Sequence, residues 1–142
     1  GCFGGGKTAT NIIDYVTIQT KGDAKDFGDL QDARAEGTGC SNTTRGIFFG
    51  GSEAGDKSKI QYITIATTGN ASDFGDLLEG LEAGGACASS TRGVHGGGTT
   101  PTKINVIQYV TIASTGNATD FGDRTTTGFG VGSFSDVNGG LG

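Results

Sequence analysis

The sequence predicts an all-β protein that consists of three repeats of 47 residues. A tyrosine and a downstream phenylalanine return together at this spacing in three places: Tyr15 with Phe27, Tyr62 with Phe74, and Tyr109 with Phe121. Gly accounts for 29 of the 142 residues and Pro for one, which is typical of a chain with many tight turns. Self-similarity at a fixed period of this length indicates blades, solenoids or arrays.

Each repeat is expected to begin with two short strands. The first is TRGIFFGG at Thr44–Gly51 and TRGVHGGG at Thr91–Gly98, where a few apolar residues run into glycines that must turn the chain. The second, IQYITIAT at Ile60–Thr67, is apolar and β-branched on both faces. That pattern is typical of a strand covered on both sides. The connection between the two strands differs from repeat to repeat.

Two further strands are expected to complete the repeat. A hairpin is predicted at Thr68–Asn70 and Thr115–Asn117, since Gly and Asn tolerate the positive φ that hairpin turns require. The DFGD motif then carries the repeated phenylalanine on a third strand, and GTGCSNTT or GGACASST supplies a fourth. Acidic residues mix with Leu at Asp29–Glu36 and Leu77–Glu82, and loops are expected there.

One repeat domain is predicted over residues 1–142, with units of about 1–45, 46–92 and 93–142. The end of the chain has the text that precedes a first strand elsewhere, so the chain is expected to close against other units. These would come from upstream sequence, if this is the C-terminal part of a longer protein, or from identical chains. The expected repeat core is Tyr15, Tyr62, Tyr109, Phe27, Phe74, Phe121, Ile18, Ile65 and Ile112.

Composition argues against several classes of function. The net charge is −5 and the Lys and Arg residues are scattered, so no nucleic-acid partner is expected. The apolar runs are too short to span a bilayer, and no membrane insertion is expected. The chain has one His and no distinctive pair of carboxylates, so neither catalysis nor a cofactor is predicted. His95 replaces Phe48 and is expected at an apolar or partly exposed strand position.

Several residues have both a structural and a functional interpretation. Cys40 and Cys87 are not in a CxxC motif and are expected to be small buried apolar residues rather than metal ligands. Arg45 and Arg92 are interpreted as one structural position of the repeat, stacked or paired at a junction. The acidic pairs suit either Ca²⁺ or turn capping, and capping is favoured; they are Asp26 with Asp29, Asp73 with Asp76, and Asp120 with Asp123.

The order of these motifs resembles the kelch repeat, in which a Gly pair is followed by Tyr and Trp. Here Phe27, Phe74 and Phe121 stand where kelch has Trp, at a longer spacing from Tyr. The text of Tyr62–Leu77 and Tyr109–Asp123, and the ending SFSDVNGGLG, is similar to tail-associated proteins of marine cyanobacterial phages. The resemblance implies four-stranded antiparallel blades in a kelch-like propeller.

The resemblance also implies a non-catalytic structural and attachment module of a phage tail, in a fibre, adhesin or nozzle-associated part, located in the virion. Expected partners are other tail or virion subunits and a host surface glycan or protein. The alternative is an extracellular, kelch-like lectin or protein-interaction propeller of cellular origin. The variable connections are the candidate binding loops, with the residues Lys7, Thr8, Ser52, Glu53, Asp56, Thr99, Thr100 and Lys103.

Overall fold

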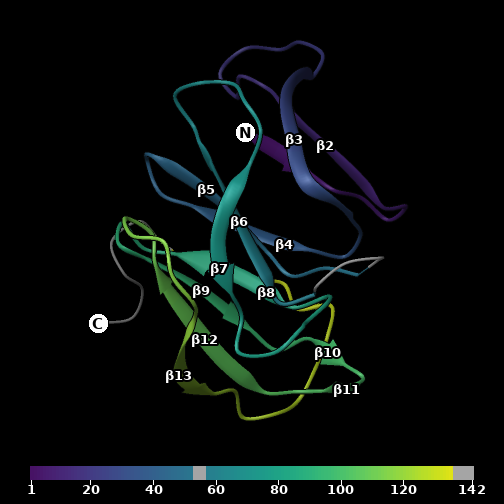
Figure 1. The fold of residues 1–142 in the computed structure, drawn as a ribbon, viewed down its shortest axis with the longest axis vertical. Helices are drawn as coiled ribbons and strands as arrows, with labels where there is room; N and C mark the ends of the chain where they lie inside the picture. The colour runs from purple at the N-terminus through teal and green to yellow at the C-terminus, as the bar shows by residue number, and fades with distance from the viewer. Residues whose placement is uncertain (53–56, 136–142) are drawn as a thin grey trace.

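The computed structural model describes residues 1–52 and 57–135 and shows an all-β chain of three antiparallel sheets (Figure 1). The sheets contain three, four and four strands and follow one another down the view in chain order. Within the described ranges, no helix is long and apolar enough to cross a membrane. The expected all-β class with short antiparallel strands is confirmed, and within the described residues the three sheets do not form a closed propeller.

Every sheet is a meander, in which each strand pairs with the next one in the sheet. The first has the order β1-β2-β3, with β1 Cys2–Gly4, β2 Thr10–Tyr15 and β3 Lys25–Arg34. The second has the order β4-β5-β6-β7, with β4 Thr38–Ser41, β5 Arg45–Phe49, β6 Lys59–Thr64 and β7 Ser72–Asp76. The third has β8 Gly85–Ala88, β9 Arg92–Gly96, β12 Val106–Thr111 and β13 Thr119–Asp123. The small hairpin β10 Thr99–Thr100 and β11 Thr102–Lys103 lies between β9 and β12.

The repeat spacing reappears in the strand register. Tyr62 on β6 is opposite Ile47, and Tyr109 on β12 is opposite Val94. Tyr15 on β2 is opposite Cys2, so the first repeat is in phase after a connection that is two residues shorter. The three sheets are therefore copies of one unit.

The strands of the GTGCSNTT and GGACASST segments belong to the sheets that follow them along the chain. β4 pairs with β5, and β8 pairs with β9. The first sheet has no counterpart of these strands among the described residues, where β1 pairs with β2 alone. The first sheet therefore has a free edge at β1.

The loop expected at Asp29–Glu36 is wrong for most of its length, because β3 continues through Arg34. Thr10 is opposite Arg34 at the far end of this pairing. In this part of β3, Gln31 and Ala33 are exposed, whereas the acidic Asp32 is half-buried and pairs with Lys59 of the second sheet. The second expected loop, Leu77–Glu82, lies outside the named strands.

Two apolar clusters fill the spaces between neighbouring sheets. The cluster between the first and second sheets is formed by Ile13, Phe27, Leu30, Ile63 and Ala71. The cluster between the second and third sheets is formed by Ile47, Phe49, Ile60, Phe74, Leu77, Leu81, Val110, Ile112 and Ala118. The core is therefore a set of junctions, each shared by two consecutive repeats.

Candidate functional site

The connection between the third and fourth strands of each four-stranded sheet, β6 to β7 and β12 to β13, docks onto the outer strand of the preceding sheet. At the first junction, the amide of Gly69 donates to the carbonyl oxygen of Phe27 over 2.7 Å, and the amide of Ala71 donates to that of Asp29 over 2.7 Å. The amide of Asp29 donates in return to Oδ1 of Asn70 over 3.0 Å. The connection thus extends the hydrogen bonding of β3 into the next repeat.

The second junction repeats these contacts. Gly116 and Ala118 donate to the carbonyl oxygens of Phe74 and Asp76, each over 2.7 Å. Asp76 donates to Oδ1 of Asn117 over 3.0 Å. The two asparagines therefore bind the preceding sheet through their side chains.

This arrangement corrects the conformation expected of the asparagines in the Thr-Gly-Asn segments, whereas the expected positive φ is found at Gly69 and Gly116, at 157° and 156°. The only described non-glycine residues with positive φ are Glu36 and Ala83, so Asn70 and Asn117 do not have the left-handed geometry expected of a tight hairpin. The strands on either side do form an antiparallel pair, but a longer connection joins them. Packing against the preceding sheet replaces the local turn as the reason for this sequence.

A buried glutamine fixes each junction at a second point. Oε1 of Gln61 accepts the amide of Gln31 over 2.7 Å, and Oε1 of Gln108 accepts the amide of Leu78 over 2.8 Å. Both glutamine side chains are fully buried, and within the described part of the chain their Nε2 atoms have no hydrogen-bond partner. Only the oxygen of each amide is used by the junction.

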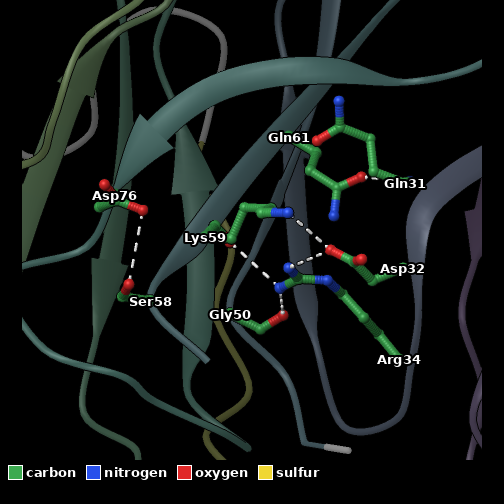
Figure 2. Close-up of polar contacts among 8 residues, drawn as sticks. All are labelled: Gln31, Asp32, Arg34, Gly50, Ser58, Lys59, Gln61 and Asp76. Atoms are coloured by element: carbon green, nitrogen blue, oxygen red, sulfur yellow. Dashed lines mark hydrogen bonds and ion pairs between the residues drawn. The ribbon is translucent and has the colours of Figure 1, made fainter. Parts of the chain in front are cut away.

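The first junction also contains a charged cluster, drawn in Figure 2. Nζ of Lys59 lies 2.7 Å from Oδ2 of Asp32, and this hydrogen bond, against a smaller opposing effect of burial, holds the pKa of the Asp32 carboxyl below its usual value. The buried guanidinium of Arg34 donates to the carbonyl oxygens of Gly50 and Lys59 over 2.6 and 3.1 Å. Arg34 thereby links the edge of the first sheet to the backbone of the second (Figure 2).

The repeated arginines stack on the repeated tyrosines, as expected for one structural position. The guanidinium carbon of Arg45 lies 4.5 Å from the ring centroid of Tyr62, and that of Arg92 lies 4.6 Å from that of Tyr109. Arg45 also donates to the carbonyl oxygen of Ile112 in the next repeat over 2.8 Å. The position therefore combines a cation–π contact with a link between sheets.

The expected repeat core differs in burial from unit to unit. Each tyrosine is half-buried and packs edge to face on its phenylalanine, with centroid separations of 5.8 to 5.9 Å. Phe27 and Phe74 are 5% and 2% exposed, whereas Phe121 is 54% exposed. Ile18, Ile65 and Ile112 are 78%, 37% and 0% exposed. The most exposed members, Ile18 and Phe121, belong to the first and third sheets, at the two ends of the stack, whereas Ile65 belongs to the second sheet and is exposed to a smaller extent.

The candidate binding loops are partly held by backbone contacts. Lys7 and Thr8 are exposed between β1 and β2. Ser52 exchanges backbone hydrogen bonds with Ala35, as Thr99 does with Glu82. Thr100 and Lys103 belong to the β10–β11 hairpin, where Nζ of Lys103 lies 4.8 Å from the ring centroid of Phe129. Glu53 and Asp56 lie outside the described residues.

The histidine and two of the cysteines lie within the strands of the second and third sheets. His95 is buried on β9 beside Phe49, and burial lowers its pKa to about 4. Burial, with the neighbouring Cys87 as a smaller cause, raises the pKa of the Cys40 thiol to about 12. Cys40 and Cys87 are half-buried free thiols. The described residues contain no group of three or more His, Cys, Asp or Glu that could hold a metal ion.

Sequence reasoning missed the side chains that join the sheets. Gln61 and Gln108 carried a usable signal, since a polar residue recurs at the repeat spacing inside otherwise apolar strands. Arg34 and Lys59 carried none, because the equivalent positions in the next repeat hold Leu81 and Val106. Searches with the whole chain found no matching protein-family model and no matching curated protein.

Proposed function

We propose that the chain is a non-catalytic structural and attachment module of a phage tail, in a fibre, adhesin or nozzle-associated part of the virion. The observation that carries the proposal is the contrast between junctions and loops. The contacts of Asn70 and Asn117, and those of Gln61 and Gln108, repeat almost identically. The connections between the first two long strands of each repeat differ in length, charge and structure. Such a division suits a rigid scaffold that presents variable loops.

The same fold supports a kelch-like propeller as the arrangement of the sheets. Two four-stranded meanders pack face to face, and their first strands β4 and β8 lie side by side. Propeller blades have this strand number and order, and their first strands line a common axis. The glycines at the end of the first long strand, Gly50 and Gly97, have φ of 52° and 70° and turn the chain in the same way in both sheets.

The absence of catalysis is proposed from the state of the reactive groups. A general base works best with a pKa near neutral pH and within reach of its substrate, whereas burial puts His95 near 4. A nucleophilic thiol needs a lowered pKa, whereas that of Cys40 is raised to about 12. These side chains serve packing between sheets.

Binding to host cells tests the attachment role. The labelled chain should bind marine cyanobacterial cells in flow cytometry, and a loop variant carrying Lys7→Ala, Thr100→Ala and Lys103→Ala should lose most of the signal. The matched control carries Lys25→Ala, Thr67→Ala and Ser114→Ala, three exposed positions outside the candidate loops, and should bind as the original does.

Equal binding by the loop variant and its control would contradict loop-mediated attachment. The alternative, a cellular kelch-like lectin or protein-interaction propeller, predicts instead that the chain binds free glycans or a cellular protein with no selectivity for cyanobacterial cells. A glycan array probed with the same two variants separates these outcomes.

A further inference from the structure

The two ends of the stack expose positions that the internal junctions bury. On the third sheet, Phe121 is largely exposed, while its equivalents Phe27 and Phe74 are buried. Beside it, a Cβ atom on Gly122 would meet no described atom within 4 Å, whereas one on Gly28 or Gly75 would collide with the carbonyl group of a docked connection. The outer face of β13 is therefore equivalent to the docking sites on β3 and β7, but no described segment of the chain occupies it.

The first sheet exposes the complementary face. Its connection Lys21–Ala24 stands in the place of the docking segments Thr68–Ala71 and Thr115–Ala118. Ala24 is exposed, although Ala71 and Ala118 are buried at their junctions. By sequence position this connection is the equivalent of a docking segment, and among the described residues it has no docking site to enter.

We propose that a second copy of this chain docks head to tail on the first, with the first sheet of one copy packed on the third sheet of the other. The internal junctions are the template for this interface, and they specify its contacts. The amides of Gly22 and Ala24 should donate to the carbonyl oxygens of Phe121 and Asp123, as Gly69 and Ala71 do to Phe27 and Asp29. Arg92 should reach the carbonyl oxygen of Ile18 of the second copy.

The polar residues of the first sheet fit this interface. Asp14 stands in the place of Gln61 and Gln108, and Asp23 in the place of Asn70 and Asn117. The internal junctions use only the oxygen of each of these amides toward the preceding sheet. A carboxylate retains that acceptor, and Asp has the length of Asn, so Asp23 can accept the amide of Asp123. Asp14 is also an acceptor, on a side chain one methylene shorter than that of Gln61 or Gln108.

The end of the described chain completes the second half of the interface. The segment Val131–Ser135 runs alongside β8. The hydroxyl groups of Ser133 and Ser135 donate to the carbonyl oxygens of Ala86 and Ala88 on that strand. By the repeat spacing, this segment is the equivalent of β4 and β8. Phe134 takes the place of Cys40 and Cys87 and is 96% exposed. The segment Val131–Ser135 is thus the sequence equivalent of a first strand; it lies beside the third sheet and outside the named strands.

The free edge of β1 is where such a strand would pair. The register of β4 on β5 transfers to Phe134 opposite Cys2, Ser133 opposite Phe3 and Gly132 opposite Gly4. A cavity of about 480 Å³ lies at this edge, lined among others by Gly1, Cys2, Gly4, Gly39 and Ile18. The cavity offers the Phe134 ring an apolar place against small residues, and the added strand gives the first sheet its fourth member.

The number of copies follows if the sheets form the kelch-like propeller proposed above, on which this step rests. One chain contributes three sheets, which is fewer than the four to eight blades of closed propellers. Two chains contribute six and fall within that range, while three chains exceed it. The head-to-tail contact should therefore close as a ring of two copies.

Light scattering after size exclusion tests the assembly with the 142-residue chain. We expect a species of twice the chain mass of 14.2 kDa. Gly122→Ala should shift it to the monomer with an unchanged circular dichroism spectrum, because the new methyl group fills the docking site. Gly116→Ala is the matched control, since it too has positive φ and open space at Cβ, and it should remain dimeric. Asp23→Asn should raise the dimer fraction by restoring the residue of the internal junctions.

A disulfide tests the strand register independently. In a chain with Cys40→Ala and Cys87→Ala, Phe134→Cys should form an intermolecular disulfide with Cys2 on mild oxidation, and Ser133→Cys should not. A monomer at all concentrations, or equal crosslinking at both positions, would overturn the interface. An open series of larger oligomers would overturn the ring of two and the propeller arrangement, and would leave the loop-binding role to be judged by the cell assay.

Discussion

The carbonyl oxygen of Gly69 occupies the space into which a Cβ atom of residue 28 would project. Gly28 is therefore required by a residue in the next repeat, and Gly75 and Gly116 reproduce the relationship at the second junction. The backbones of consecutive repeats approach each other at these points more closely than any side chain would allow.

Replacing Gly28 tests this close approach. Gly28→Ala and Gly69→Ala each place a side chain at positive φ, at a cost of about 1 to 3 kcal/mol. Gly28→Ala should lose about 1 to 3 kcal/mol more, because its methyl group also overlaps the Gly69 carbonyl group. Urea unfolding of the two variants measures the difference. Equal losses would mean that the junction yields without cost.

The repeated tyrosine should contribute through its ring. Tyr62 packs edge to face on Phe74 and beneath the Arg45 guanidinium, and we expect Tyr62→Ala to lower the free energy of unfolding by about 2 to 4 kcal/mol. Tyr62→Phe keeps both ring contacts and should lie within about 0.5 kcal/mol of the original protein. Denaturant unfolding curves measure both losses. A loss of unfolding free energy below about 0.5 kcal/mol for the alanine variant would mean that the ring faces solvent.

The two stacked arginines separate the cation–π contact from the link between repeats. Arg45→Ala removes both the stack and the hydrogen bond to Ile112, whereas Arg92→Ala removes the stack alone among described contacts. A hydrogen bond from a charged group is worth about 1.5 to 3 kcal/mol, so Arg45→Ala should be the more harmful by at least about 1 kcal/mol. The comparison requires unfolding curves recorded at concentrations where the chain is monomeric.

His95 should make stability depend on pH. Its pKa is about 4 in the folded chain and about 6.5 when unfolded, so between these values the unfolded chain binds the extra proton. Stability is therefore complete above about pH 6.5 and falls as the pH is lowered toward 4, by a total of about 3 kcal/mol. His95→Phe introduces the residue that the preceding repeat has at position 48. In this variant, the free energy of unfolding should no longer change with pH between about 4 and 6.5. A slope that persists in this variant would assign the effect to carboxylates.

The sequence predicted what is local or periodic. The period, the Tyr and Phe pairs and the short strands all follow from patterns within one repeat. It did not predict the role of Asn70, whose partner Asp29 lies 41 residues earlier and becomes a neighbour only when two sheets pack. The same limit applies to the second half of β3, where an acidic sequence suggested a loop and pairing with β2 imposed a strand. Contacts between sheets outweigh local preference at these positions.

Each repeat carries both halves of a junction: a segment that docks on the preceding repeat and a site that receives the segment of the following repeat. A tandem duplication of a whole repeat therefore copies both halves of the contact. The inserted repeat can dock on the repeat before it and receive the repeat after it without further mutation. Such a gene can gain or lose repeats without compensating substitutions elsewhere. Meanwhile the connection between the first two long strands is free to diverge in every new copy, so the number of repeats and the surface they display can evolve separately.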